Sequence, residues 1–328
     1  MKNFLIIQTA SIGDAILATS LIEKLHQHFP EARIDFLLKN GVDGLLKGHP
    51  FIHQLIIWDK ANKKYRNLRT ILKQIRASHY DCVINVQRYT TTGFITTFSG
   101  AHCKVGFNKN PFSLFFTRKV KHRIRKNNKH EVERNHELIR NITDDEPAPV
   151  RLYPSQQDYA ATSTYKTHRY ITIAPASLWY TKQYPESKWT EFVADIDPGL
   201  YIYFLGSAQD KPMCETIIKD AKHPNCLNLA GKLSFLETAA LMKDAGMNFV
   251  NDSAPQHIAS AMNAPVTVLF CSTVPEFGFG PLSDDAVVLE TRKELDCKPC
   301  GLHGWDQCPK KHFDCALTID KKELLKRI

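Results

Sequence analysis

The stretch from Phe249 to Phe270 constrains the fold most, because it reads as a buried strand, a polar turn, a short helix and a second buried strand. Two strands joined through a helix normally lie parallel in one sheet. Asp252 or Ser253 can cap this helix, and Pro255 suits its first turn. Such a turn is typical both of an ordinary capped loop and of an anion site, because first-turn amides carry partial positive charge.

The same alternation of strands and helices occurs in two parts of the chain. Before a Pro-rich, weakly periodic stretch at 141–157, short apolar runs predict strands at 4–8, 34–38, 55–58, 82–86 and 105–107. Helical spacing covers 15–25, 65–77 and 131–142. After that stretch, strands are predicted at 170–174, 201–205 and 248–250, and helices at 189–196, from about 212, at 235–244 and at 321–328.

This pattern predicts an α/β chain of two doubly wound, Rossmann-like domains that face a central cleft. We place the domains at 1–155 and 156–317, and a terminal helix that packs back on the first domain at 318–328. In such sheets ligands bind outside the carboxyl ends of the strands. Gly13 and Asp14 follow the first predicted strand, where glycine permits a tight turn or a close approach to a ligand. No G-x-G-x-x-G is present, which weakens a dinucleotide-binding reading.

The net charge of +9 favours an anionic partner, whether nucleic acid, a phosphorylated small molecule or a membrane surface. Much of this charge lies between Arg118 and His130, which could equally be a solvated basic loop. No apolar run is long enough to span a bilayer or to act as a signal peptide, so we expect a cytoplasmic protein.

Four motifs occur in an order that identifies a resemblance: Ser-Ile-Gly-Asp at 11–14, the loop at 174–185 that contains Lys182, Gly-Ser-Ala-Gln-Asp at 206–210, and Asn-Asp-Ser-Ala-Pro-Gln-His at 251–257. In these motifs, over essentially its whole length, the chain resembles glycosyltransferase family 9, the group that contains the lipopolysaccharide heptosyltransferases. The resemblance implies a GT-B fold in which 1–155 holds the acceptor and 156–317 holds the nucleotide-sugar. It also implies inverting transfer of heptose from ADP-heptose to the inner core of lipopolysaccharide, without a cofactor for catalysis.

The resemblance also assigns roles to individual residues. Asp14 corresponds to the proposed general base, and Lys182 to the cation that contacts the donor phosphates. The donor-binding candidates are Lys182, Asp210, Asp252, Ser253, Ala254 and His257. The acceptor-binding candidates are Ser11, Gly13 and Arg134. The family usually has glycine where this chain has Ala254, so we expect a shifted loop or a displaced donor phosphate there.

Structural alternatives stand beside these roles. Asp14 can simply cap a helix, Lys182 can be an exposed loop cation, and His257 can be a hydrogen-bonded histidine within the helix. With no metal in catalysis, the departing diphosphate would be stabilised by Lys182 and the helix amides near Ser253. The basic stretch would bind the anionic acceptor or the inner-membrane surface, which predicts peripheral membrane attachment.

Four of the nine cysteines crowd into a tail at 297–315, with the spacing C-x2-C-x7-C-x6-C (Cys297, Cys300, Cys308 and Cys315). Four thiolates at such spacing can hold structural Zn²⁺ or Fe. The alternative is free thiols or a disulfide, although a cytoplasmic setting disfavours disulfides. By resemblance, similar tails occur in heptosyltransferase II-like sequences, and a related protein heptosyltransferase group has a four-Cys iron finger.

Two other functions remain open from the sequence. One is a glycosyltransferase with a different nucleotide-sugar, or with a protein or another glycan as acceptor. The other is a non-enzymatic polyanion-binding protein, which only the basic stretch at 118–130 supports. Because no nucleic-acid motif accompanies that stretch, we do not expect nucleic acid as a partner.

Overall fold

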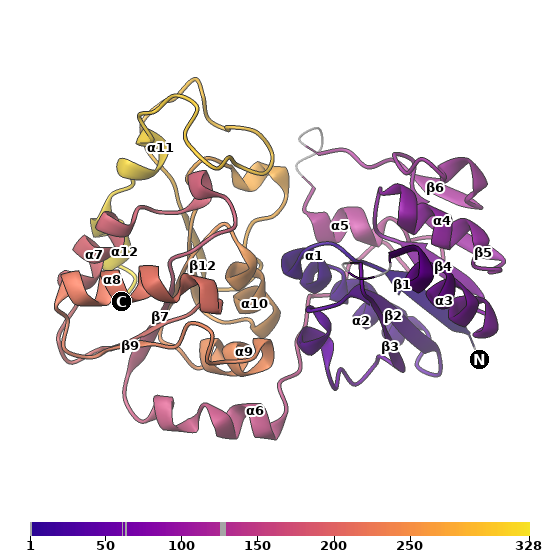
Figure 1. Cartoon of the computed structure of the whole chain (residues 1–328), viewed down its shortest axis with the longest axis horizontal. Helices are drawn as coiled ribbons and strands as arrows, with labels where there is room; N and C mark the ends of the chain where they lie inside the picture. Colours follow the sequence, from indigo (N-terminus) through magenta and orange to yellow (C-terminus); the bar gives the residue numbers. More distant parts are fainter. Residues whose placement is uncertain (1, 61, 63, 125–128) are drawn as a thin grey trace. The chain divides into compact units, whose positions relative to one another are not determined.

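The computed structural model describes residues 2–60, 62, 64–124 and 129–328. The chain divides into two compact units, Met1–Tyr153 and Pro154–Ile328. Among the described residues, each unit has one six-stranded parallel sheet with helices on its faces (Figure 1). The predicted α/β class with two doubly wound, Rossmann-like units is confirmed.

The first unit is built from short strands, of which the central ones are mostly apolar and buried. Its strands are β1 Asn3–Ile7, β2 Arg33–Lys39, β3 Gln54–Trp58, β4 Cys82–Asn85, β5 Cys103–Phe107 and β6 Arg118–Val120. Its helices are α1 Ile12–Leu17, α2 Thr19–His28, α3 Lys64–Ala77, α4 Thr90–Phe98 and α5 Glu131–His136, with 3-10 turns η1 Asp43–Leu46 and η2 Ser113–Phe115.

The strand order of the first unit is β3-β2-β1-β4-β5-β6. The chain therefore winds outward from β1 in one direction and then from β4 in the other, and the switch point lies between these two strands. Their register pairs Ile6 with Ile84 and Ile7 with Asn85, so both strands end at the same level. The turns that follow β1 and β4 consequently share one edge of the sheet.

The second unit repeats this plan. Its strands are β7 Tyr170–Ala174, β8 Tyr201–Phe204, β9 Cys226–Asn228, β10 Asn248–Asn251, β11 Val266–Leu269 and β12 Ala286–Leu289. Its helices are α6 Gln156–Ala161, α7 Glu186–Ala194, α8 Lys211–Ala221, α9 Phe235–Lys243, α10 Ala254–Met262, α11 Asp314–Leu317 and α12 Lys321–Leu325. Single 3-10 turns are η3 Ser163–Lys166, η4 Tyr180–Lys182, η5 Ala208–Asp210 and η6 Pro275–Phe277.

The strand order of the second unit is β12-β11-β10-β7-β8-β9, which puts its switch point between β7 and β10. Its core is rich in aromatic rings, with Trp189 and Phe192 of α7 buried against Phe249 of β10. The short helix α12 also packs on α7 through buried Leu324. Residues 321–325, which the sequence analysis set apart in a terminal helix, thus pack within this unit.

Candidate functional site

Three loops leave the carboxyl ends of neighbouring strands in the second unit. The loop after β7 carries η4 and Lys182, the turn after β10 carries Asp252, and the segment after β11 carries Ser272 and Thr273. Because β7, β10 and β11 are adjacent in the sheet, these loops meet at one edge. This edge includes the switch point, where a doubly wound sheet binds its ligand.

Lys182 and Asp252 form an ion pair at this edge, with 2.6 Å between Nζ and Oδ2. Only 16% of the Lys182 side chain and 7% of the Asp252 side chain are exposed. Asp252 also accepts hydrogen bonds from Thr273 Oγ1 at 2.5 Å and from Gln256 Nε2 at 3.1 Å. Both carboxylate oxygens therefore have protein partners, and Asp252 is placed to orient Lys182.

Asn251, the last residue of β10, fastens both ends of the Lys182 loop. Its Oδ1 accepts a hydrogen bond from the Tyr184 amide at 2.9 Å, and its Nδ2 donates to the Pro175 carbonyl at 2.7 Å. The side chain is fully buried. From the sequence, Asn251 is recognisable only as part of the polar turn, because its partners lie 67 and 76 positions away.

Helix α10 begins at Ala254, with Ser253 as an extended N-cap residue. The Ser253 hydroxyl donates to the Asn251 carbonyl at 3.3 Å and makes no capping hydrogen bond, so neither expected cap forms. Ala254 has an ordinary helical backbone and is not among the residues with positive φ. Alanine therefore fits where the family usually has glycine, and the expected loop shift is not needed to accommodate it.

His257 lies one turn into α10 and is 6% exposed. Its ring Nε2 is 3.4 Å from the Gln256 amide nitrogen, and that amide also donates to the Phe279 carbonyl at 3.1 Å. His257 therefore belongs to the packed layer behind the helix start. These contacts match the structural alternative that the sequence left open for this residue.

Asp210 follows β8, the strand beside β7, and ends η5. Its Oδ2 accepts hydrogen bonds from the amide and the hydroxyl of Ser207 at 2.7 and 2.8 Å, which forms a capping box. A Cβ on Gly206 would lie 2.9 Å from this carboxylate, so glycine is required for the close approach. Asp210 thus shapes the turn at the strand end.

The first unit carries an equivalent capping box at its own switch point. Ser11 is the N-cap of α1, and its hydroxyl donates to Asp14 Oδ2 at 2.5 Å while the Ser11 amide donates at 3.2 Å. Within the described residues, Oδ1 of Asp14 makes no hydrogen bond. Gly13 is buried inside α1 with a helical backbone, so it serves helix packing and not a left-handed turn.

Neighbouring strands fix the turn that precedes Asp14. Thr9 donates to Gln87 Oε1 at 2.7 Å from the loop after β4, and Lys60 donates to the Thr9 carbonyl at 2.7 Å from the loop after β3. The turn before Asp14 is therefore held by hydrogen bonds, and one carboxylate oxygen of Asp14 is occupied by the capping contact with Ser11. This arrangement suits a carboxylate that accepts a proton through its other oxygen.

Arg134 is buried in α5, where its Nε donates to Glu131 Oε2 at 2.5 Å and its guanidinium also bonds to the Lys129 carbonyl. Glu131 in turn contacts His122 Nε2 at 3.3 Å. Burial would raise the pKa of Glu131, but the His122 hydrogen bond and the Arg134 charge outweigh it and hold the pKa below 4.5. Arg134 thus stabilises the fold of the basic segment, and residues 125–128 of that segment lie outside the described residues.

Comparison with known proteins identifies the family. The profile of glycosyltransferase family 9 (heptosyltransferase) matches residues 68–304, well over half of the chain. This chain belongs to glycosyltransferase family 9. It is 27% identical over 315 residues to lipopolysaccharide heptosyltransferase 3 of Escherichia coli K12, an alignment that covers 87% of this chain and 89% of the relative.

Two solved structures share the fold of this family 9 chain. The E. coli ADP-heptose LPS heptosyltransferase II superposes with a TM-score of 0.80 at 21% identity, covering 100% of this chain and 97% of the other. A family 9 glycosyltransferase from Veillonella parvula superposes with a TM-score of 0.84 at 20% identity, covering 99% and 95%. The chain is thus a glycosyltransferase with the GT-B fold, and the non-enzymatic alternative is set aside.

The Cys-rich tail of this glycosyltransferase is tied to the Lys182 loop. The Thr181 amide donates to the Trp305 carbonyl at 3.0 Å, and the Trp305 amide donates to Thr181 Oγ1 at 2.8 Å. A Cβ on Gly304, whose φ is +87°, would lie 3.0 Å from Lys182 Cγ. The tail therefore packs directly against the loop that carries the lysine.

Cys297, Cys300, Cys308 and Cys315 line one small cavity together with His312. Sγ of Cys297 is 3.6 Å from Nε2 of His312. Burial, followed by the neighbouring Cys297 and Cys308 thiols, raises the pKa of Cys300. Among the described residues, no group of three or more His, Cys, Asp or Glu side chains is arranged to hold a metal ion.

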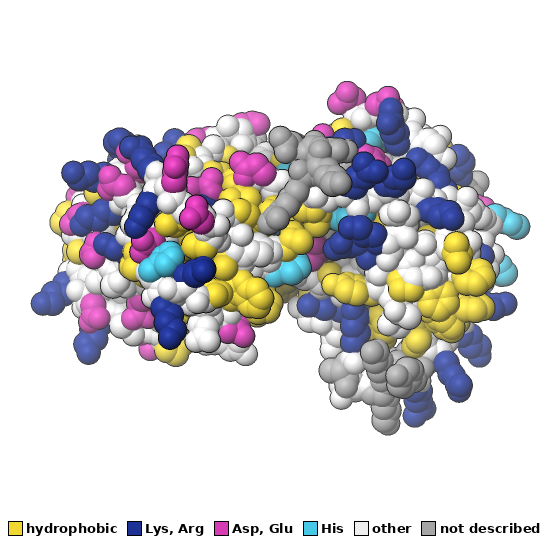
Figure 2. Space-filling model, turned by 90° about the horizontal axis from the view of Figure 1, so that it is seen from above, with side chains coloured by type: hydrophobic (Ala, Val, Ile, Leu, Met, Phe, Trp, Pro, Cys, Tyr) yellow, Lys and Arg dark blue, Asp and Glu magenta, His cyan; other side chains and the backbone are white. Residues whose placement is uncertain are grey.

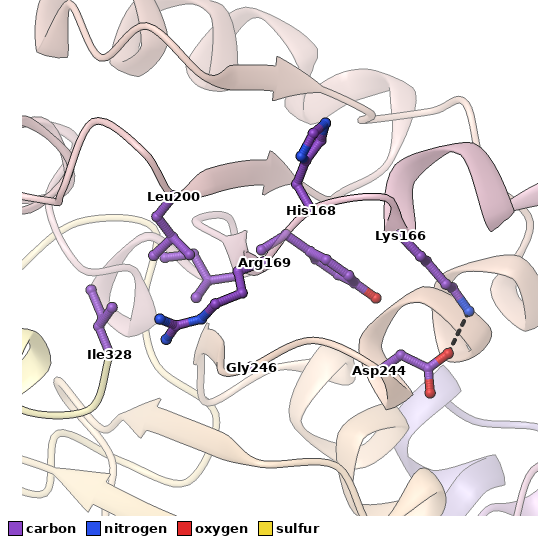
Figure 3. A pocket seen from close by; sticks show the side chains of 9 residues that line it. Lys166, His168, Arg169, Leu200, Asp244, Gly246 and Ile328 are labelled. Carbon is purple, nitrogen blue, oxygen red and sulfur yellow. Dashed lines mark hydrogen bonds and ion pairs between the residues drawn. The ribbon is translucent and has the colours of Figure 1, made fainter.

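A larger cavity, about 520 Å³ in volume, opens at the opposite end of the second sheet (Figure 3). Arg169 and Gly246 line it just before β7 and β10 begin, and Lys166 spans one side in an ion pair with Asp244 at 2.6 Å. Because it lies at the amino ends of the strands, this cavity is separate from the Lys182 site.

In the part of the chain that the structure describes, no helix has the length and apolarity to cross a membrane.

Proposed function

We propose that this family 9 enzyme transfers heptose from ADP-heptose to the inner core of lipopolysaccharide, with inversion at the anomeric carbon and Asp14 as the general base. The observation that carries the proposal is the Lys182–Asp252 pair beside the start of α10, at the switch point of the second sheet. The names of the relatives, which are heptosyltransferases, support the sugar and the acceptor.

In the proposed reaction, an acceptor hydroxyl oxygen bonds to the anomeric carbon while the bond from that carbon to the donor phosphate breaks. The leaving ADP takes the bonding electrons, so negative charge grows on its diphosphate. Lys182 and the first-turn amides of α10 stabilise this charge. Asp14 accepts the hydroxyl proton through Oδ1, while Oδ2 stays bound to Ser11 and fixes the orientation of the carboxylate.

The donor class is tested by thermal shift with ADP, UDP, GDP and their sugars. Stabilisation by ADP species alone supports the proposal, because a ligand that binds only the folded state raises the unfolding temperature. Stabilisation by UDP or GDP species instead would show that the donor carries a different nucleotide. Transfer assays with heptose-deficient lipopolysaccharide, a protein and a different glycan then distinguish the acceptors.

We also propose that Cys297, Cys300, Cys308 and Cys315 hold a structural metal ion, Zn²⁺ or Fe. Their ligand chemistry and their shared cavity support it, and closure would need the thiols to move closer together. Metal analysis of protein purified without chelator should find about one ion per chain, lost in a Cys297→Ser/Cys300→Ser variant and kept in a Cys226→Ser control. Four titratable thiols in metal-free, fully stable protein would refute the site.

A further inference from the structure

We infer that a surface formed by α4 and the segment between β5 and β6 docks this enzyme on an anionic lipid bilayer. The inference deepens the proposed function and rests on it in one respect, because a lipid-borne acceptor gives such docking its purpose. The surface consists of an apolar patch and the cations around it. We define the apolar patch as Phe94, Phe98, Phe112, Leu114 and Phe115.

The apolar patch exposes large side chains to solvent. Leu114 is 79% exposed, Phe115 is 62% exposed and Phe98 is 45% exposed. The rings form one group: the Phe94 centroid lies 4.7 Å from that of Phe98 and 6.1 Å from that of Phe112, which lies 6.2 Å from Phe115. Contiguous exposed apolar surface of this kind marks an interaction site in a soluble protein.

The loop that presents the patch is anchored on both sides, so the exposure is built into the fold. Buried Asn110 donates to the Gln87 and Tyr89 carbonyls at 3.2 and 3.1 Å, and its Oδ1 accepts from the Phe112 amide at 2.9 Å. A Cβ on Gly93 would lie only 2.0 Å from Asn110 Oδ1. After the patch, the chain turns inward at Phe116, which is 6% exposed.

The sequence around the patch carries charge of one sign. From Cys82 to His130 the sequence has ten Lys and Arg and no Asp or Glu. Lys109 lies in the loop that leads to the patch, and Lys119 and Lys121 follow it at the edge strand β6; all three are exposed. Figure 2 shows hydrophobic side chains gathered on part of the first unit, with Lys and Arg nearby.

An apolar patch rimmed by cations fits a bilayer with anionic headgroups better than it fits a protein partner. Aromatic and leucine side chains insert at the headgroup boundary, while Lys and Arg are attracted to the negative surface potential. The patch follows β4 and β5, and β4 is paired with β1, the strand that precedes Asp14. Docking would therefore hold the first unit, which carries Asp14, at the membrane surface.

Vesicle flotation of the full-length protein tests this inference, with vesicles that contain no lipopolysaccharide. We expect binding to phosphatidylglycerol/phosphatidylethanolamine vesicles that is much weaker on neutral vesicles and weakened by salt. Leu114→Ser/Phe115→Ser should lower the partition coefficient at least ~10-fold, because it removes the inserted apolar groups. Lys119→Glu/Lys121→Glu should lower it by a similar factor on anionic vesicles alone.

Matched controls use the same substitutions in the second unit. Leu227→Ser on β9 changes another exposed leucine, and Lys219→Glu on α8 another exposed lysine, and both should bind vesicles like the wild type. Unfolding temperature and ADP binding should stay unchanged in all variants, which separates this inference from the proposed function. If binding required lipopolysaccharide in the vesicle, or if the patch variants bound as well as the wild type, the inference that this surface binds the bilayer would be wrong.

Discussion

The substitution Asn251→Ala probes how the donor site is held. Asn251 makes two buried hydrogen bonds, from the Tyr184 amide and to the Pro175 carbonyl, at the two ends of the Lys182 loop. Its removal leaves both backbone groups without this partner in a buried setting. At about 1–3 kcal/mol for each unsatisfied group, the free energy of unfolding should fall by about 2–6 kcal/mol.

For a unit of this size, where each kcal/mol shifts the unfolding temperature by about 2–4 °C, that loss corresponds to a fall of roughly 4–24 °C. The dissociation constant for ADP should rise at the same time, because the loop no longer holds Lys182 beside Asp252. Calorimetry measures the first effect, and titration of ADP well below the new unfolding temperature measures the second.

The matched control is Asn225→Ala. Asn225 also donates to a proline carbonyl, that of Pro198 at 2.7 Å, but it lies in a half-buried loop away from the site. Asn225→Ala should lower the free energy of unfolding by about 1 kcal/mol and leave the affinity for ADP unchanged. If Asn251→Ala kept both the unfolding temperature and the ADP affinity of the wild type, Asn251 would not be the residue that holds the Lys182 loop in place.

Three further predictions concern charged groups. Asp14→Asn should reduce transfer by at least ~100-fold while ADP binding stays nearly intact; wild-type turnover would exclude Asp14 as the base. Lys182→Ala should weaken ADP binding and slow transfer together, and unchanged steady-state kinetics would contradict its phosphate role. The lowered pKa of Glu131 means that its contribution to stability is complete above about pH 4.5 and is lost as pH falls through the lower folded-state value. Glu131→Gln should therefore unfold at lower temperature at pH 7 and show a flatter pH dependence below pH 5, and parallel curves for the two proteins would refute this.

Strands with continuous apolar runs could be predicted from the sequence, since burial on both faces demands them. The edge strands Arg118–Val120 and Cys226–Asn228 could not, because they are three residues long, only partly buried and contain polar residues. The edge strand Ala286–Leu289 is apolar, but it is only four residues long and partly buried, so it was not predicted either. Their pairing depends on the sheet beside them and leaves little local pattern.

The candidate site, like the fold, could be predicted only in part from the sequence. The positions of Asp14, Lys182 and Asp252 at strand ends follow from local order along the chain. The contact between Lys182 and Asp252 joins residues 70 positions apart, and that between Thr273 and Asp252 depends on two adjacent strands. The pairing of Asp252 with Lys182 could therefore be seen only in the folded chain, and donor binding by Asp252 stays a prediction.

The Lys182–Asp252 pair has a consequence for turnover. A lysine that is paired with a carboxylate presents little net charge, so this pair should attract free phosphate and other small anions only weakly. If Lys182 binds the donor diphosphate as proposed, the diphosphate would compete with Asp252 for the same ammonium group, which would lower the affinity for donor and product alike. On the same proposal, the ion pair between Asp252 and Lys182 would form again after transfer and so assist the departure of the nucleotide.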